Sequence, residues 1–140
     1  MPDGCPGYPE DGAYYISTSN LCVGNQQVGD VDNIVVNDQK TAFYLRWLHA
    51  NPCTYEINLG DHQDSTQFVR HDKQWINIYN GQYQQWVLNK VSGNTYTIAQ
   101  QDNTSLVWTD PGPGGPANRQ LQLQTFKTNN SNQQFLISED

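Results

Sequence analysis

The tripeptide pattern Tyr-x-Ile occurs three times along the chain at equal spacing. The copies begin at Tyr14, Tyr55 and Tyr96, so that successive copies are 41 residues apart. Self-similarity with a period of 20–50 residues indicates repeated structural units that stack on one another. A unit of about 40 residues buries too little apolar surface to fold alone. The spacing therefore predicts three units that share one core.

Short apolar runs separated by turn formers fill each unit. Beside the Tyr-x-Ile strands, the runs are 21–23, 34–36, 68–69, 75–78, 106–108 and 121–123. Their alternation of apolar and polar residues is typical of half-buried β-strands. Gly, Asn, Asp and Pro fill the gaps, most densely in 109–120. We expect an all-β chain of about twelve strands, with an N-terminal extension 1–11 and one domain 12–140 divided at about 52 and 93.

A second motif closes two of the units. Gln84-Gln85-Trp86 and Gln133-Gln134-Phe135 both place a glutamine two residues before an aromatic residue. The first unit lacks this glutamine, and we assign its closing aromatic to Trp47. The aromatic residue would pack in the core, and the glutamine would satisfy backbone groups where strands turn. The assignment predicts equivalent positions for Trp47, Trp86 and Phe135.

Three units of this size, each opening with Tyr-x-Ile and closing with Gln-x-Trp, resemble the β-trefoil of ricin-B-type lectins over residues 12–138. The opening EDGAYYI also resembles small mushroom trefoils. These include fungal lectins, the lectin-like light subunit of mushroom tyrosinase, and the mycocypin and mycospin protease inhibitors. The resemblance implies a β-trefoil with approximate threefold symmetry and a non-enzymatic carbohydrate-binding function, for mannose-type or galactose-type sugars.

The resemblance places the best sugar site in the third unit. In ricin-B-type lectins a sugar-binding repeat reads Asn-Gln-x-Trp, and here Asn132 and Gln133 match it. Asp110 and Asn132 would hydrogen-bond the sugar hydroxyls, which need donors and acceptors in a fixed arrangement. Gln133 would brace the turn, and Trp108 or Phe126 would stack on the C–H face of the ring. An Asx-type turn at Asp110 and a capped turn at Asn132 are the structural alternatives.

Two other functions use the same scaffold. A trefoil protease inhibitor needs only a projecting loop, for which Arg70, Lys73 and Arg119 are candidates against trypsin-like targets. Against cysteine proteases, the candidates are Asn20, Gly24 and the turn 50–53. A lectin-like accessory subunit would dock on a partner protein without binding sugar. We do not expect an enzyme, because no motif arranges a catalytic set of residues.

Charge and composition restrict the partners. The formal net charge is −7, which disfavours binding to nucleic acid and to anionic membranes. No apolar run approaches the roughly 20 residues that span a bilayer. The three histidines show no metal-ligand spacing, so we expect neither a metal nor a cofactor. Glycans are the expected partners, and a homo-oligomer or a partner subunit is left open.

The chain has three cysteines, Cys5, Cys22 and Cys53. An odd number excludes complete internal pairing, and the spacing matches no zinc motif. We favour thiols over a disulfide, with one disulfide as the alternative. The N-terminus shows no signal-peptide pattern, so we expect a cytoplasmic protein or one exported by a non-classical route.

Overall fold

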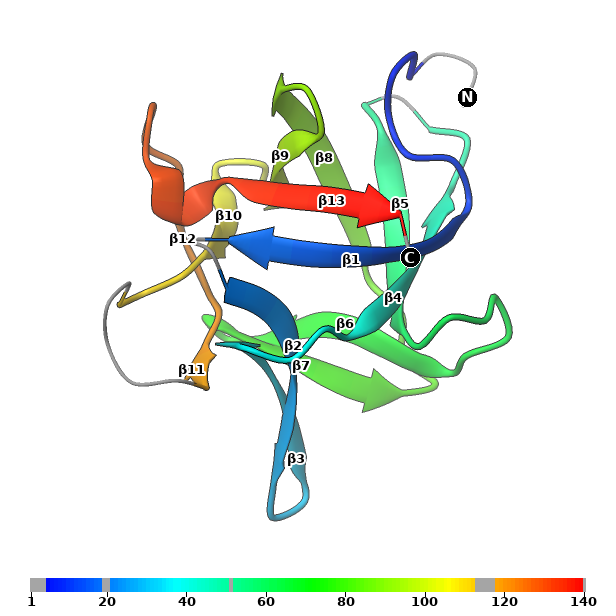
Figure 1. Cartoon of the computed structure of the whole chain (residues 1–140), viewed down its shortest axis with the longest axis vertical. Coiled ribbons are helices and arrows are strands. Elements are labelled where there is room, and N and C mark those ends of the chain that lie inside the picture. Colours follow the sequence, from blue (N-terminus) through cyan, green and yellow to red (C-terminus); the bar gives the residue numbers. More distant parts are fainter. Residues whose placement is uncertain (1–4, 19–20, 51, 113–117, 140) are drawn as a thin grey trace.

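The computed structural model describes residues 5–18, 21–50, 52–112 and 118–139. The regular secondary structure of this part of the chain is β-strand, as expected, apart from one 3₁₀ turn, η1 (Ser131–Gln133) (Figure 1). The strands are β1 (Gly12–Thr18), β2 (Leu21–Val28), β3 (Val31–Asn37), β4 (Ala42–Trp47), β5 (Thr54–Leu59), β6 (Gln67–Asp72), β7 (Trp75–Asn80), β8 (Gln85–Ser92), β9 (Thr95–Gln100), β10 (Leu106–Thr109), β11 (Arg119–Gln120), β12 (Gln122–Thr125) and β13 (Phe135–Glu139).

Six strands form a closed antiparallel barrel. Strand β1 pairs with β4, β4 with β5, β5 with β8, β8 with β9, β9 with β13, and β13 again with β1. Figure 1 shows β13 and β1 side by side, which closes the ring between the two ends of the chain. Closure leaves no barrel strand with an unpaired edge.

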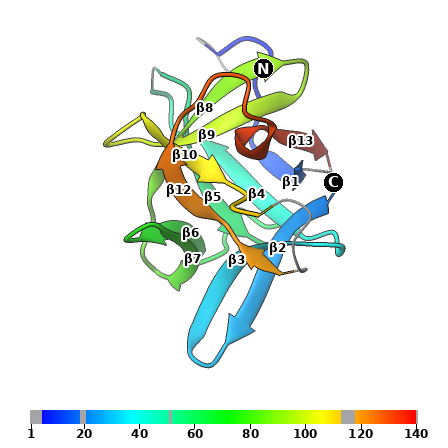
Figure 2. The ribbon, with the colours of Figure 1, turned by 90° about the vertical axis from the view of Figure 1, so that its left-hand side faces the viewer.

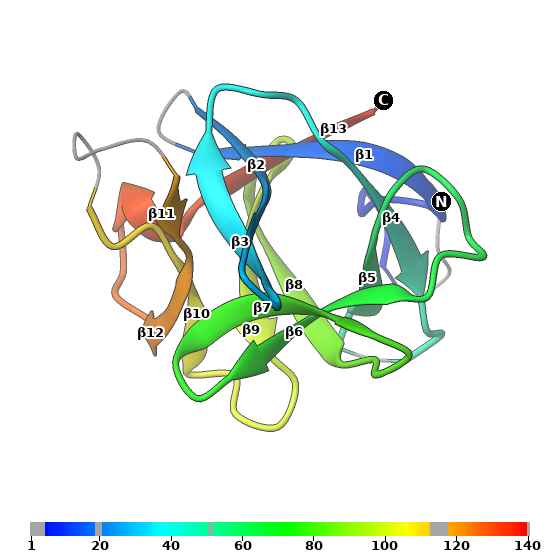
Figure 3. The ribbon, with the colours of Figure 1, turned by 90° about the horizontal axis from the view of Figure 1, so that it is seen from below.

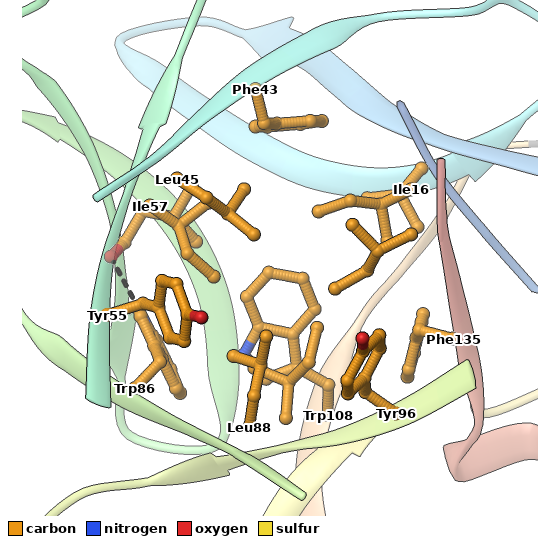
Figure 4. Close-up of a cluster of buried hydrophobic side chains, with 14 of the residues drawn as sticks. Ile16, Phe43, Leu45, Tyr55, Ile57, Trp86, Leu88, Tyr96, Trp108 and Phe135 are labelled. Carbon is orange, nitrogen blue, oxygen red and sulfur yellow. Dashed lines mark hydrogen bonds between the residues drawn. The ribbon is translucent and has the colours of Figure 1, made fainter. Parts of the chain in front are cut away.

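Each barrel strand sends an aromatic residue and, two positions later, an aliphatic residue into the core. This spacing follows from the pleat, which turns alternate side chains to the same face. The pairs, all buried, are Tyr14 and Ile16, Phe43 and Leu45, Tyr55 and Ile57, Trp86 and Leu88, Tyr96 and Ile98, and Phe135 and Ile137. Figure 4 shows several of these side chains converging from opposite walls.

The closing aromatic of the first unit is Phe43, so the assignment to Trp47 is wrong. In each unit the barrel tyrosine lies opposite a buried aromatic residue: Tyr14 opposite Phe43, Tyr55 opposite Trp86, and Tyr96 opposite Phe135. Trp47 is only half-buried and lies opposite Tyr55, across the boundary between the first two units. Thr41 stands where the other units have their glutamine, which hid this position from the motif.

Three hairpins close one end of the barrel. They are β2–β3, β6–β7 and β10–β12, and Figure 3 shows the first two facing the viewer. Further ladders join them to one another, β3 to β7, β7 to β12 and β11 to β3. Each third of the chain thus contributes barrel strands and one hairpin. The β2–β3 hairpin also projects from the body (Figures 1 and 2), and the two valines at its tip, Val28 and Val31, are exposed.

The N-terminal segment 5–11 covers part of the other end of the barrel. A disulfide joins Cys5 to Cys53, and Cys22 is a free thiol, so the favoured expectation of unpaired thiols is wrong and its alternative of one disulfide is confirmed. Three hydroxyls hold the segment: Tyr14 donates to the carbonyl of Glu10 at 2.6 Å, Tyr55 to Pro9 at 2.6 Å, and Tyr96 to Gly7 at 3.1 Å. Burial raises the pKa of all three tyrosines. No helix in the described part of the chain is long and apolar enough to span a membrane.

Candidate functional site

Asp110 is held inside the protein by an arginine. Its carboxylate is buried, and Arg119 donates from Nε to Oδ1 at 2.9 Å and from Nη2 to Oδ2 at 2.7 Å. The backbone amide of Gly112 donates to Oδ1 as well. The hydrogen bonds to Asp110 raise the pKa of Arg119, although burial opposes the shift. Both carboxylate oxygens therefore accept hydrogen bonds from the chain itself.

Trp108 lies in the middle of the core. It is fully buried, and its ring meets Trp86 at 5.4 Å and Phe135 at 5.8 Å between centroids, edge to face in both cases. Figure 4 shows it surrounded by side chains from the barrel walls. A ring that is covered in this way offers no face to a ligand in solution, so Trp108 does not serve as a stacking plate.

Gln133 and Asn132 belong to the turn around η1. Gln133 is buried, accepts from the backbone amide of Lys127 at 2.9 Å, and donates to Thr109 Oγ1 at 3.2 Å and to the carbonyl of Thr125 at 3.0 Å. Asn132 is half-buried, and its carbonyl accepts from the backbone amide of Asp110 at 2.9 Å. The structure therefore brings Asp110, Asn132 and Gln133 together, mainly through contacts that hold the turn.

Phe126 lies beside a different depression. It is 45% exposed and lines a hollow of about 320 Å³ with Val91, Asn130 and Gln134, which we call the Phe126 hollow. None of the other four predicted site residues lines it. The five residues predicted from the sequence are thus divided among the core, a braced turn and this separate surface.

A polar hollow of about 320 Å³ lies where the second and third units meet, and we call it the Tyr83 hollow. Strand β6 contributes Arg70 and His71, the start of β8 and the preceding loop contribute 83–85, and the end of β9 and the following turn contribute 100–102. Its volume is at the lower end of the range for ligand pockets, about 300–1,000 Å³. Four glutamines, one histidine, one arginine and one carboxylate therefore converge on one surface.

His71 organises the floor of the Tyr83 hollow. Its backbone amide donates to Gln84 Oε1 at 2.9 Å, its Nδ1 lies 3.0 Å from the carbonyl of Lys73, and its Nε2 lies 2.9 Å from Gln100 Nε2. Because a carbonyl can only accept, Nδ1 donates to Lys73, and the Gln100 amide is placed to donate to Nε2. These contacts fix the orientation of two of the amides.

Tyr83 forms an open aromatic wall beside these amides. It is 60% exposed, more than any other large hydrophobic side chain described, and the edge of its ring contacts Phe68 at 6.1 Å between centroids. The neighbouring Gln101 and Asp102 are exposed too. The sequence analysis missed this site, although an aromatic residue directly before Gln84-Gln85 marked it. An exposed ring next to fixed amides and a carboxylate can bind a flat ligand that is rich in hydroxyls.

A larger hollow does not offer such a surface. It measures about 490 Å³ and lies at the barrel end covered by the N-terminal segment, lined by Tyr8, Tyr14, Tyr96 and Glu139 among others. Tyr14 and Tyr96 are buried there, and their hydroxyls already donate to the segment. No group of three or more His, Cys, Asp or Glu residues in the described ranges could hold a metal ion.

Comparisons with known proteins identify the fold. No protein-family model and no curated protein matches the sequence. Among solved structures, the Macrolepiota procera ricin B-like lectin in complex with lactose superposes with a TM-score of 0.72 at 11% identity, over 94% of this chain and 98% of the lectin. The Rhizoctonia solani agglutinin gives 0.72 at 11% identity, over 97% and 100% of the two chains.

A mosquitocidal holotoxin also matches, with a TM-score of 0.71 at 20% identity over 94% of this chain. The present chain spans only 17% of the length of that toxin. At such low identities, the likeness concerns the fold alone. The chain is an all-β protein whose structural neighbours include a ricin B-like lectin and an agglutinin.

Proposed function

We propose that the protein binds carbohydrate without catalysis and that the Tyr83 hollow is its sugar site. The observation that carries the proposal is the exposed ring of Tyr83 beside amides that the chain itself holds in place. The fold supports it, because one structural neighbour is a ricin B-like lectin in complex with lactose. We also propose that the three thirds of the chain are repeats of one β-trefoil unit, related by approximate threefold symmetry.

The groups in the hollow suit the two faces of a pyranose. The C–H face of the sugar would stack on Tyr83, as apolar C–H groups do on aromatic rings. The hydroxyl edge would meet the donors and acceptors of the glutamine amides that their contacts with His71 leave unused. The sugar site predicted from the sequence in the third unit is not proposed as a whole, because the side chains of Asp110 and Trp108 are committed to contacts inside the protein.

A single site of this size binds a monosaccharide weakly, and affinity in such proteins increases with the number of linked sites. The Phe126 hollow is a second candidate, since it also has an exposed aromatic ring among threonine and asparagine side chains. Mannose-type and galactose-type sugars both fall within the proposal. Neither nucleic acid nor membrane is a proposed partner of a chain with a net charge of −7.

A glycan array on the purified protein, followed by titration calorimetry with the glycan that binds best, tests the proposal. Tyr83→Ala should lower the affinity for that glycan at least tenfold, by about 1.4 kcal/mol or more, if the ring is the stacking plate. Phe126→Ala is the matched control, because it removes an exposed ring of similar size from the other hollow. Loss with Phe126→Ala alone would move the site to the Phe126 hollow. No binding on the array would reject the proposed function.

One observation favours a second candidate, docking to another protein. The β2–β3 hairpin projects from the body, and its tip carries Val28 and Val31, 57% and 49% exposed, on either side of Gly29 and Asp30. A projecting loop with small apolar residues is the shape expected of a trefoil protease inhibitor or an accessory subunit. Inhibition assays against papain and trypsin, with Val28→Asp as the variant, separate this candidate from the sugar site.

We also propose that the protein works in an oxidising environment. The Cys5–Cys53 disulfide supports this, because disulfides persist outside the reducing cytosol and are rare within it. Of the two locations expected from the sequence, export agrees with the disulfide better than the cytoplasm does. Thiol labelling of the protein isolated from its native source, without reduction, tests the proposal: one reactive cysteine is expected, and three would reject it.

A further inference from the structure

We infer that the Tyr83 hollow selects sugars that carry a carboxylate group, and that Arg70 is the residue that recognises the carboxylate. The inference rests on the proposed function, because it names the class of sugar that the hollow binds. Among the residues that the structure describes, Arg70 has no carboxylate as an ion-pair partner, and a buried donor in the same hollow has no acceptor.

Arg70 is a cation that neighbouring side chains hold in position. It is half-buried on β6, its Nη1 donates to Gln82 Oε1 at 3.0 Å, and its guanidinium lies 5.4 Å from the centre of the Tyr79 ring. The two other arginines of the chain, Arg46 and Arg119, each form an ion pair with a buried carboxylate. Among the described residues, Arg70 forms no such pair, and its remaining N–H groups are available to a ligand.

The second observation concerns Gln84. Its Oε1 accepts from the backbone amide of His71, which fixes Nε2 as a donor, and Nε2 is buried without an acceptor among the described residues. In the third unit the corresponding Gln133 donates from Nε2 to Thr109 Oγ1. Thr109 lies two residues after Val107, which pairs with Ala99, and Arg70 lies two residues after Phe68, which pairs with Asn58, the residue 41 positions before Ala99. The second unit therefore has a cation where the third has an acceptor.

The N–H groups of Arg70 that do not contact Gln82, and Nε2 of Gln84, have no acceptor among the described residues, and they define what the ligand must supply. A carboxylate accepts hydrogen bonds through two oxygens and matches the planar fork of a guanidinium. Such charge-assisted bonds are about twice as strong as neutral ones. A neutral hydroxyl could satisfy one donor but would leave the charge of Arg70 unbalanced. The group that best completes the hollow is thus a carboxylate on a sugar ring, as in a uronic acid.

Two carboxylates near Arg70 repel an anionic ligand. Removing one of these charges should therefore increase the affinity for a carboxylated sugar. Asp102 lines the same hollow, and Asp72 lies two residues after Arg70 on β6. Asp102 is exposed, so its repulsion of a bound anion is weakened by water and salt. Removing its charge should strengthen the binding of a carboxylated sugar and leave that of a neutral sugar nearly unchanged.

The experiment compares glucuronate with its neutral amide, glucuronamide, by titration calorimetry at low ionic strength. Wild type should bind glucuronate at least tenfold more tightly than glucuronamide. Arg70→Gln should remove that preference, a loss of about tenfold or more for glucuronate alone. Asp102→Asn should raise the affinity for glucuronate about two- to fivefold. Lys127→Gln is the control, because it removes the same charge from an exposed position outside the hollow.

Each other outcome decides against the inference in a recognisable way. Equal affinity for glucuronate and glucuronamide would overturn it and leave the proposed function standing. An equal loss with Lys127→Gln would mean that net charge, and not the hollow, attracts the anion. Acetate that competes as well as glucuronate would show anion binding without sugar recognition. Failure of both sugars to bind, with no glycan bound on the array, would reject the proposed function itself.

Discussion

The Cys5–Cys53 disulfide should provide a large part of the stability of this small protein. The two cysteines are 48 residues apart in sequence, so the bond closes a long loop in the unfolded chain. The chain-entropy relation gives about 4 kcal/mol for a loop of this length at 25 °C. Cys5 and Cys53 are both buried, so Ser at both positions also places two hydroxyls in the core and adds to the loss.

The assay is equilibrium unfolding in urea, followed by tryptophan fluorescence, for wild type and for Cys5→Ser/Cys53→Ser. We expect the free energy of unfolding to fall by about 3–5 kcal/mol. Cys22→Ser is the control, since Cys22 is a free thiol and its replacement should change the free energy by much less. Wild type in reducing agent should behave as the double variant does. A double variant within 1 kcal/mol of wild type would refute the reasoning.

Three further predictions concern the core and the charged groups. Trp86→Ala should lower the free energy of unfolding by about 3–5 kcal/mol, measured by urea unfolding, because it truncates a fully buried aromatic residue; an unchanged value would remove Trp86 from the core. Arg119→Ala should lower the free energy of unfolding by about 3–5 kcal/mol in the same assay, because it leaves the buried Asp110 carboxylate unpaired. Adding Asp110→Asn to that variant should partly restore its stability. Above about pH 10 stability should fall, because tyrosines in the unfolded chain lose their protons there while buried Tyr55, whose pKa is raised by burial, keeps its own; a flat profile up to pH 11 would contradict this.

The sequence predicted much of the barrel but not all of its strands. Tyr-x-Ile identified three barrel strands, and Gln-x-aromatic identified two more, because aromatic and aliphatic residues two positions apart share one face. For the sixth strand, β4, the sequence led to the wrong closing aromatic residue. Trp47 is a more conspicuous residue than Phe43, but it turns out to be half-buried beside the boundary between units. Register is decided by pairing with β1 and β5, which a local motif does not contain.

The candidate site was harder to predict for a physical reason. The Tyr83 hollow combines segments 70–71, 83–85 and 100–102, which come together only when the units pack. Asp110 was expected to face a ligand, but Arg119, nine residues later, pairs with it. Trp108 was expected to stack on a sugar and is instead central to the core. Residue type alone does not distinguish an exposed tryptophan from a buried one, because both occur in strands with turn formers on either side.

The most direct test of the account is to map where sugar contacts the protein. Titrating ¹⁵N-labelled protein with glucuronate and with lactose, and following amide chemical shifts, locates the site without assuming it. We predict that the largest changes in amide chemical shift occur in residues 70–71, 83–85 and 100–102. Tyr83→Ala should abolish these changes, while the remaining amide signals should still be those of a folded protein. Shifts confined to the turn at 126–134, or no shift with either sugar at millimolar concentration, would contradict it.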